Sequence, residues 1–212
     1  MEKYIFLDFN GTVLNDVDLC LNLLNMMLVE KGKKALDITE YKNVFTFPIK
    51  TYYEKAGFDF IGYTYEELAD FFVVEYSRRN VTESFIYTDF RDFIKEVRVL
   101  GYKIILCSAS MEKMLLEQLK QFGIDDVFDD VIALSDHFAI SKLELTKEYV
   151  KNHSIDLSKS YFIGDTTHDA EVGKECGLNV ILVERGHQSY DVLKTQKTLI
   201  VKDFLEVLNY LK

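Results

Sequence analysis

The sequence predicts an α/β fold: a core with a Rossmann-like, doubly wound parallel sheet, into which an all-helical cap domain is inserted. Three observations support this prediction. Short, continuous apolar runs recur along the chain, helical patterns separate them, and a long stretch after the first run contains no convincing strand. The 212 residues suffice for one α/β domain with an inserted module.

Five apolar runs predict the strands of the core. They lack the alternation of apolar and polar residues that is typical of a strand with one solvated face, so we expect a sheet that is covered on both faces. The runs are residues 4–7, 103–107, 131–134, 161–163 and 180–183.

Helical patterns lie between these runs. Residues 90–100 place their apolar side chains on one helical face, and residues 114–122 nearly do so before Gly123 ends the helix. Ser141 opens a further helix as the first residue of a capping box, and Phe204 begins the last one. Strands that alternate with helices indicate a parallel, doubly wound sheet.

One stretch breaks this alternation. Residues 17–28 carry an apolar helical stripe, and Thr64 and Glu67 form a capping box that opens a second clear helix. The aromatic segment 45–60 between them holds the only proline and predicts one or two short helices. The predicted domain boundaries are residues 1–13 plus 86–212 for the core and residues 14–85 for the cap.

The composition limits the partners and the compartment. A net charge of −10 predicts a surface that repels nucleic acid and anionic membranes. Three scattered cysteines without C-x-x-C spacing argue against a disulfide framework or a zinc site and favour a reducing cytoplasm. We see neither a signal peptide nor a window long enough to span a membrane. We therefore expect a cytoplasmic protein, monomeric or homodimeric, without nucleic-acid or membrane partners.

Polar residues at the predicted strand ends are the candidates for chemistry, because ligands of open parallel sheets bind beyond the carboxyl ends of the strands. These residues are Asp8 and Asn10 after the first strand, Ser108 and Ser110 after the second, Asp165 and Asp169 after a later one, and Lys142 at the start of the preceding helix.

The segments around Asp8 and Ser108 each allow two interpretations. The sequence Asp-Phe-Asn-Gly fits an ordinary turn, but it also places a carboxylate at a buried strand end. Gly11 there lets the backbone approach a ligand, so that loop amides can bind phosphate oxygens. Ser108 is either an ordinary strand end, with Ser110 as the N-cap of the next helix, or a hydroxyl that contacts phosphate.

Asp165 and Asp169 are four residues apart, so both can face one point beyond the sheet. With Asp8 they would form a hard oxygen site suited to Mg²⁺. Asp169 has a second interpretation as the capping-box partner of Thr166. Lys142 opposes the helix dipole at its position, a local conflict that often marks a functional site, although a solvated surface lysine is the commoner case.

The order of these motifs resembles the haloacid dehalogenase superfamily. The matching residues are Asp8-Phe-Asn10-Gly-Thr12, Ser108, Lys142 and Gly164-Asp165-x-x-x-Asp169, within residues 4–183. The helical insert looks like the cap of phosphoglycolate-phosphatase-like members. The resemblance implies a Mg²⁺-dependent phosphatase that acts on a small phosphorylated metabolite.

The resemblance also implies a role for each matching residue. Asp8 would attack phosphorus and form an aspartyl-phosphate, which water later hydrolyses. Asp8, Asp165 and the backbone carbonyl of Asn10 would bind Mg²⁺, and Asp169 would support the metal directly or through water. The metal and an ammonium would neutralise the repulsion between the anionic nucleophile and the phosphate.

Ser108 and Lys142 would hold the transferring phosphoryl oxygens. Further candidate substrate contacts are Gly11, Thr12, Ala109 and, in the aromatic segment of the cap, Tyr52. The rings of that segment have a second interpretation as the hydrophobic core of the cap.

Asn10 departs from the family pattern, which has a second Asp at this position. That Asp protonates the leaving group and then activates water, whereas an amide exchanges no useful proton near neutral pH. Four explanations are open: a substrate with a good leaving group, a proton donor elsewhere (for example in the cap), an engineered substitution, or deamidation of Asn10-Gly11. We favour the first two.

Other functions are consistent with parts of this pattern. A dehalogenase also lacks the second Asp but has no use for the Asp165 and Asp169 metal loop. A phosphonate-cleaving enzyme would need a reactive cap lysine, and a phosphomutase is less attractive with Asn10. A metal- and phosphate-binding protein without turnover is the alternative from another class.

Overall fold

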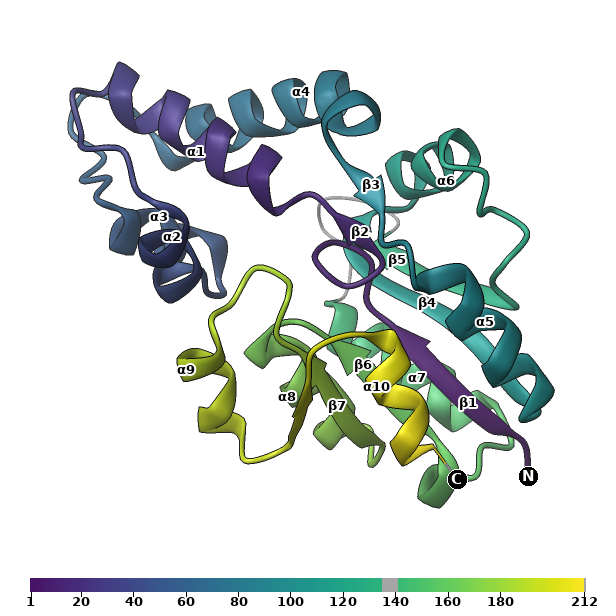
Figure 1. The fold of residues 1–212 in the computed structure, drawn as a ribbon. Coiled ribbons are helices and arrows are strands. Elements are labelled where there is room, and N and C mark those ends of the chain that lie inside the picture. Colours follow the sequence, from purple (N-terminus) through teal and green to yellow (C-terminus); the bar gives the residue numbers. More distant parts are fainter. Residues whose placement is uncertain (135–140, 212) are drawn as a thin grey trace.

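The computed structural model describes residues 1–134 and 141–211, and its core is a six-stranded parallel sheet. The strands lie in the order β5 (Asp130–Leu134), β4 (Tyr102–Met111), β1 (Lys3–Leu7), β6 (Tyr161–Gly164), β7 (Asn179–Val183) and β8 (Leu199–Val201) (Figure 1). All neighbouring pairs in this sheet run parallel. The five predicted runs form the first five of these strands. β8 has no counterpart among the predicted runs.

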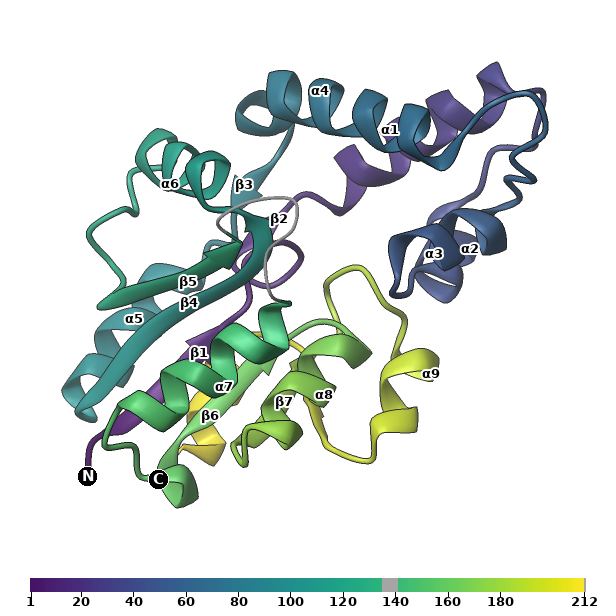
Figure 2. The same ribbon diagram turned by 180° about the vertical axis from the view of Figure 1, so that it is seen from behind.

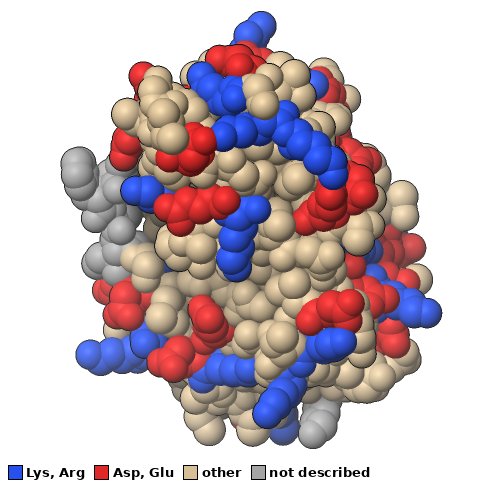
Figure 3. All heavy atoms as spheres, turned by 90° about the vertical axis from the view of Figure 1, so that its left-hand side faces the viewer, with Lys and Arg blue, Asp and Glu red and all other residues tan. Residues whose placement is uncertain are grey.

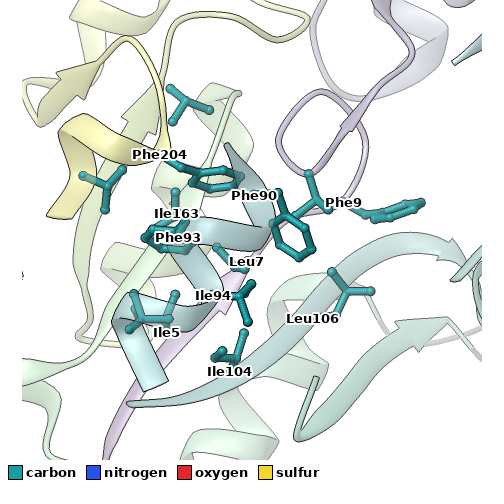
Figure 4. Packing of buried hydrophobic residues seen from close by; sticks show 14 of the residues in the cluster. Ile5, Leu7, Phe9, Phe90, Phe93, Ile94, Ile104, Leu106, Ile163 and Phe204 are labelled. Atoms are coloured by element: carbon teal, nitrogen blue, oxygen red, sulfur yellow. The ribbon is translucent and has the colours of Figure 1, made fainter. Parts of the chain in front are cut away.

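Both faces of the sheet are covered, as the uninterrupted apolar runs predicted. Ile5 and Leu7 of β1 point into one cluster with α5 (Phe90–Val99), α6 (Glu112–Gln121) and α10 (Phe204–Val207), part of which Figure 4 shows. Tyr4 and Phe6 point into a second cluster with α7 (Lys142–Asn152) and α8 (Thr167–Glu175). Because successive side chains of a strand point to opposite faces, β1 is buried on both sides.

The remaining short elements of the core are α9 (Tyr190–Leu193) and the 3₁₀ turns η1 (Leu157–Lys159), η2 (Lys194–Gln196) and η3 (Leu208–Tyr210). None of the described helices is long and apolar enough to cross a membrane. Cys20, Cys107 and Cys176 are buried free cysteines.

Four helices lie beyond the sheet: α1 (Val17–Glu30), α2 (Ile38–Val44), α3 (Ile49–Ala56) and α4 (Tyr65–Glu83) (Figure 2). Their apolar side chains form a hydrophobic cluster of their own, separate from the clusters at the sheet. The helical insert is thus present. The boundary between cap and core at residues 14–85 stays a prediction.

A two-stranded antiparallel ribbon joins the insert to the core, where the sequence analysis found no strand. It pairs β2 (Leu14–Asn15) with β3 (Phe85–Ile86). Each strand has two residues, too few to show a periodic pattern, and the two pair across the whole insert. The ribbon holds the start of α1 and the end of α4 side by side.

The predicted capping boxes differ in outcome. Those at Thr64 and Thr166 are complete. The Ser141 side chain accepts a hydrogen bond from the Glu144 N–H, but no return bond from Glu144 is seen. Ser110 is not the N-cap of α6, because β4 continues past it to Met111 beyond an irregularity in its pairing with β5.

The cap contacts the core through segments 41–47 and 185–189. Ser189 N donates to the Lys42 carbonyl at 3.1 Å, and Gln188 Nε2 donates to the Phe45 carbonyl at 2.9 Å. The ring of Phe45 stacks on the imidazole of His187 with centroids 4.8 Å apart. On the face that Figure 3 shows, basic and acidic side chains are interspersed, in keeping with a charged surface of mixed sign.

Candidate active site

Three carboxylates meet at the carboxyl edge of the sheet. Asp8 follows β1, Asp165 follows β6, and Asp169 lies in the first turn of α8. Each offers a carboxylate oxygen within 4.8 Å of those of the other two. The neighbouring parallel strands β1 and β6 bring together residues that are more than 150 positions apart in the sequence.

Lys142 lies between two of these carboxylates. Its Nζ donates to Asp8 Oδ1 at 2.5 Å and to Asp169 Oδ1 at 2.7 Å. The residue is 3% exposed, so its position at the N-terminus of α7 is not that of a solvated surface lysine. Burial opposes its charge, but Asp169 and Asp8 raise the pKa of Lys142 above the usual lysine value. The lysine is therefore the counter-ion of the cluster.

The carboxylates outnumber this cation. Burial raises the pKa of Asp8 to about 8. The attraction of Lys142 lowers this pKa, but repulsion from the other two carboxylates offsets part of that attraction. Burial likewise raises the pKa of Asp165 to about 6. Burial also opposes the ionisation of Asp169, but the ammonium of Lys142 lowers the pKa of Asp169 below its usual value. Three buried carboxylates with one ammonium are unstable as ions unless further positive charge is supplied.

The donor set fits a hard divalent cation. All three side chains offer oxygen ligands, which suit Mg²⁺, and a charge of +2 offsets the two carboxylates that Lys142 leaves unbalanced.

Neighbouring groups fix Asp165. Thr12 Oγ1 donates to its Oδ1 at 2.9 Å, and the His187 N–H donates to its Oδ2 at 2.6 Å. A Cβ atom on Gly11 or Gly186 would lie 2.3 or 2.1 Å from Asp165 Oδ2, so both positions require glycine. The hydroxyl of Thr12 thus orients this carboxylate, and substrate contact by Thr12 stays a prediction.

Asp169 is the capping-box partner of Thr166, as one of its two interpretations predicted, and it also faces the carboxylate cluster, where a role at a metal stays a prediction. Its Oδ2 accepts from the Thr166 N–H at 3.0 Å and from the Thr166 hydroxyl at 2.7 Å, which closes the capping box. Its Oδ1 faces Lys142. The capping box at the N-terminus of α8 therefore orients this carboxylate toward the cluster.

The other predicted contacts lie in different surroundings. Ser108 is buried in β4, where its Oγ accepts from the Ser110 N–H at 3.1 Å, and Ala109 is exposed beside it. Tyr52 is 5% exposed within the cap cluster, against Tyr41 and Phe45, apart from the carboxylates. Substrate contact by these residues stays a prediction.

Asn10 is held by side chains that the sequence analysis did not single out. Its Nδ2 donates to Asp16 Oδ2 at 2.8 Å and to the Tyr76 hydroxyl at 2.7 Å. The Asp16 carboxylate in turn contacts His187 Nε2 at 3.1 Å, and His187 Nδ1 lies 2.7 Å from the Tyr41 hydroxyl. Asp16 lies only six positions from Asn10, but Tyr76 and His187 lie 60 and 171 positions from Asp16, so no regular spacing signalled this set of contacts in the sequence.

The fold and the site together define a class: a doubly wound α/β protein with a helical cap and with three carboxylates and a lysine at its strand ends. A family model described as haloacid dehalogenase-like hydrolase matches residues 4–183. The chain belongs to this family. The predicted resemblance to its phosphoglycolate-phosphatase-like members is confirmed.

Two curated relatives are phosphatases by name. A phosphoglycolate phosphatase of Psychrobacter arcticus is 22% identical over 223 residues, which cover 100% of this chain and 96% of the relative. Pyrophosphatase PpaX of Halalkalibacterium halodurans is 24% identical over 98 residues, which cover 46% of each protein. Together with the family, they confirm the prediction of an enzyme of the phosphatase type.

Solved structures of low sequence identity share the fold. A haloacid dehalogenase-like hydrolase from Streptococcus pneumoniae superposes with a TM-score of 0.80 at 18% identity, covering 99% of this chain and 98% of that one. A predicted phosphatase from Clostridium acetobutylicum gives the same TM-score and coverage at 19% identity. The predicted fold class, a parallel sheet core with a helical cap, is confirmed.

Proposed function

We propose that this protein is a Mg²⁺-dependent phosphatase that hydrolyses a small phosphorylated metabolite through an aspartyl-phosphate on Asp8. One observation supports the proposal above the others: the buried ammonium of Lys142 lies between Asp8 and Asp169, with Asp165 beside them. This arrangement combines a nucleophilic carboxylate, a counter-ion for phosphate oxygens and a set of oxygen ligands.

Asp8 is the nucleophile in this proposal. Its side chain is the most accessible of the three carboxylates, at 12% exposure against 3% for Asp169, while Asp165 is fully buried. The carboxylate oxygen attacks phosphorus, the bond from phosphorus to the leaving group breaks, and Asp8 becomes phosphorylated. Water then attacks the same phosphorus and releases inorganic phosphate and the free carboxylate.

Lys142 and Ser108 hold the phosphoryl group during transfer. The Lys142 ammonium stabilises the charge that spreads over the phosphoryl oxygens, as fixed cations do in phosphoryl transfer. Ser108 would add a hydrogen bond from its hydroxyl. Asp8, Asp165 and the carbonyl of Asn10 would hold Mg²⁺, with Asp169 in support. Bound there, the ion supplies charge neutralisation to the approach of an anionic nucleophile to an anionic phosphate.

The rival activities are less consistent with the site. A dehalogenase has no need for Asp165 and Asp169, which the fold places beside the nucleophile. A non-catalytic binding protein has no need for a nucleophile paired with a buried lysine. The small substrate, the Mg²⁺ and the cytoplasmic location stay predictions, as do the monomeric or dimeric state and the absence of nucleic-acid partners.

A phosphatase screen tests the proposal. Phosphoglycolate, sugar phosphates, nucleotides, acyl phosphates and pyrophosphate are assayed for phosphate release with Mg²⁺ or EDTA, and intact mass is recorded for the phosphorylated enzyme. We expect release that requires Mg²⁺ and is abolished in Asp8→Asn, while the control Asp18→Asn, at an exposed carboxylate of α1, retains activity. Activity in EDTA, or hydrolysis by Asp8→Asn, would contradict the proposed mechanism.

A further inference from the structure

Asp16 is a buried carboxylate outside the metal cluster, and every contact that the structure gives it is a donor. It is 1% exposed. Its Oδ2 accepts from Asn10 Nδ2 at 2.8 Å and from the Tyr76 hydroxyl at 2.7 Å. Its Oδ1 accepts from the Gly11 N–H and faces His187 Nε2, both at 3.1 Å. A carboxylate in these surroundings is stable as an anion that only accepts hydrogen bonds.

The Asp16 carboxylate requires a hydrogen-bond donor from the side chain of residue 10. The atom of residue 10 that faces Asp16 must carry a hydrogen. The only proton of the Tyr76 hydroxyl points to Asp16, so the Tyr76 oxygen accepts the second hydrogen of Asn10 Nδ2 at 2.7 Å. Asn10 Oδ1 accepts from the Ser110 hydroxyl at 3.3 Å. An amide satisfies all three contacts, whereas an ionised carboxylate would bring two anions together.

Among the described residues, the side chains that contact Asn10 have no free proton to give to a leaving group. Tyr76 is buried and donates its only hydroxyl proton to Asp16 at 2.7 Å. Both ring nitrogens of His187 are engaged, by Asp16 and by the Tyr41 hydroxyl. In residues 1–134 and 141–211, the titratable side chains that contact Asn10 are thus Asp16 and Tyr76, and these two are hydrogen-bonded to each other.

This inference rests on the phosphatase function proposed above. We propose that Asp16 and Tyr76 are positioning residues, which hold a neutral amide at position 10 through their hydrogen bonds. The enzyme then selects substrates whose leaving group departs as a stable anion, namely acyl phosphates and phosphoanhydrides.

The chemistry balances without a general acid. An Asp8 oxygen forms a bond to phosphorus, the bond to the leaving oxygen breaks, and the electron pair departs on a carboxylate or phosphate anion. In the second step, water forms the new bond to phosphorus and the Asp8 oxygen leaves as a carboxylate. The proton that water loses goes to an oxygen of the departing inorganic phosphate.

A series of leaving groups tests the inference on the wild-type chain. We would measure kcat/KM with saturating Mg²⁺ for acetyl phosphate, pyrophosphate, glycerol phosphate, phosphoglycolate and substituted phenyl phosphates. We expect kcat/KM to fall steeply as the pKa of the leaving group rises. Acetyl phosphate should exceed the alkyl esters by at least ~100-fold, the lower end of what general acid catalysis supplies.

Exchanging the two side chains provides a matched variant set. Asn10→Asp alone places a second carboxylate against that of Asp16, so the melting temperature of this variant should fall. The double variant Asn10→Asp/Asp16→Asn restores a donor and acceptor pair and puts an acid at position 10. Its melting temperature should recover, and its turnover of alkyl esters should rise by ~100-fold or more relative to wild type. Asp16→Asn alone should retain the steep dependence on the leaving group.

The outcomes separate this inference from the proposed function. Equal rates for acetyl phosphate and alkyl esters in the wild type would overturn the inference and leave the phosphatase intact. A selective loss of alkyl ester turnover in Tyr76→Phe would overturn it too, because Tyr76 would then be the proton donor. No turnover of any compound, with no phosphorylated enzyme, would overturn both.

Discussion

Replacing Lys142 with methionine removes the cation that lies among three buried carboxylates. Methionine keeps an apolar side chain of similar length but lacks the ammonium, whose Nζ lies 5.1 Å from the ring centroid of Phe162. The substitution therefore tests the charge. At an effective dielectric constant of about 20, each contact of 2.5 and 2.7 Å contributes ~6 kcal/mol of Coulomb attraction. Desolvation offsets much of this, and breaking a buried pair costs about 3–5 kcal/mol in practice.

This magnitude predicts a large shift in the melting temperature. For a chain of 212 residues, about 2–4 °C are lost per kcal/mol, so Lys142→Met in EDTA at pH 8 should melt about 6–20 °C below the wild type. The control is Lys147→Met on the same helix. Lys147 is partly exposed and its pairs are longer, at 3.4 and 3.6 Å, so its loss should cost less than about 1 kcal/mol.

The shift should depend on pH in a defined direction. The pKa values of Asp8 and Asp165 are raised in the folded state to about 8 and about 6, so their contribution to stability is full below about 4 and is lost as pH rises through these values. Protonation replaces part of the missing charge, so Lys142→Met should be less destabilising at pH 5.5 than at pH 8. A difference of under about 1 °C between variant and wild type at pH 8 would refute the charge balance.

Three further predictions concern the metal, its surroundings and the intermediate. Mg²⁺ should raise the melting temperature of the wild type more at pH 8 than at pH 5.5, since only the ionised forms of Asp8 and Asp165 bind it; an equal shift would contradict their role. Gly186→Ala should weaken Mg²⁺ binding by ~10-fold or more in calorimetry, because its Cβ would displace Asp165, while the melting temperature in EDTA reports whether the fold survives. With Asn10 in place of a general base, hydrolysis of phosphorylated Asp8 should limit the rate, so dinitrophenyl phosphate should give an initial burst of phenol of about one equivalent per enzyme. A linear time course from the first turnover would count against that slow step.

Local signals predicted the central strands and the helix starts. Five strands are apolar runs in the sequence; four of them are mostly buried, and the edge strand β5 is partly buried. Thr64 and Thr166 cap their helices through contacts three residues away. The strand β8 escaped because three residues, Leu199–Val201, are too short a run to distinguish from a loop. Ser110 was misplaced because a serine near a strand end fits both a cap and an irregular strand.

The residues of the site also fall into those that sequence position predicts and those that it does not. Asp8, Asp165, Asp169 and Lys142 follow from position, because strand ends of a parallel sheet converge on one edge. The contact of Asn10 with Tyr76 does not follow from position, since it depends on how the cap packs on the core. Tyr76 comes from α4 and meets Asn10 across 66 positions, and nothing in its local sequence distinguishes it from the other aromatic side chains of the cap.

Within residues 1–134 and 141–211, two groups of side chains have the spacing of potential metal ligands, and charge balance gives them different roles. The cluster of Asp8, Asp165 and Asp169 has one ammonium for three carboxylates and gains from a divalent cation.

The second group, Asp16, Cys20 and His187, is equally close-packed, but its charges and lone pairs are already matched. Burial disfavours the charged imidazole, yet Asp16 raises the pKa of His187, so the pair approaches neutrality as an ion pair. A cation there would have to displace the donors from Asn10, Gly11 and Tyr76. The charge of the first group thus suits a divalent cation, and the second group links the loop that follows Asp8 to the helical insert.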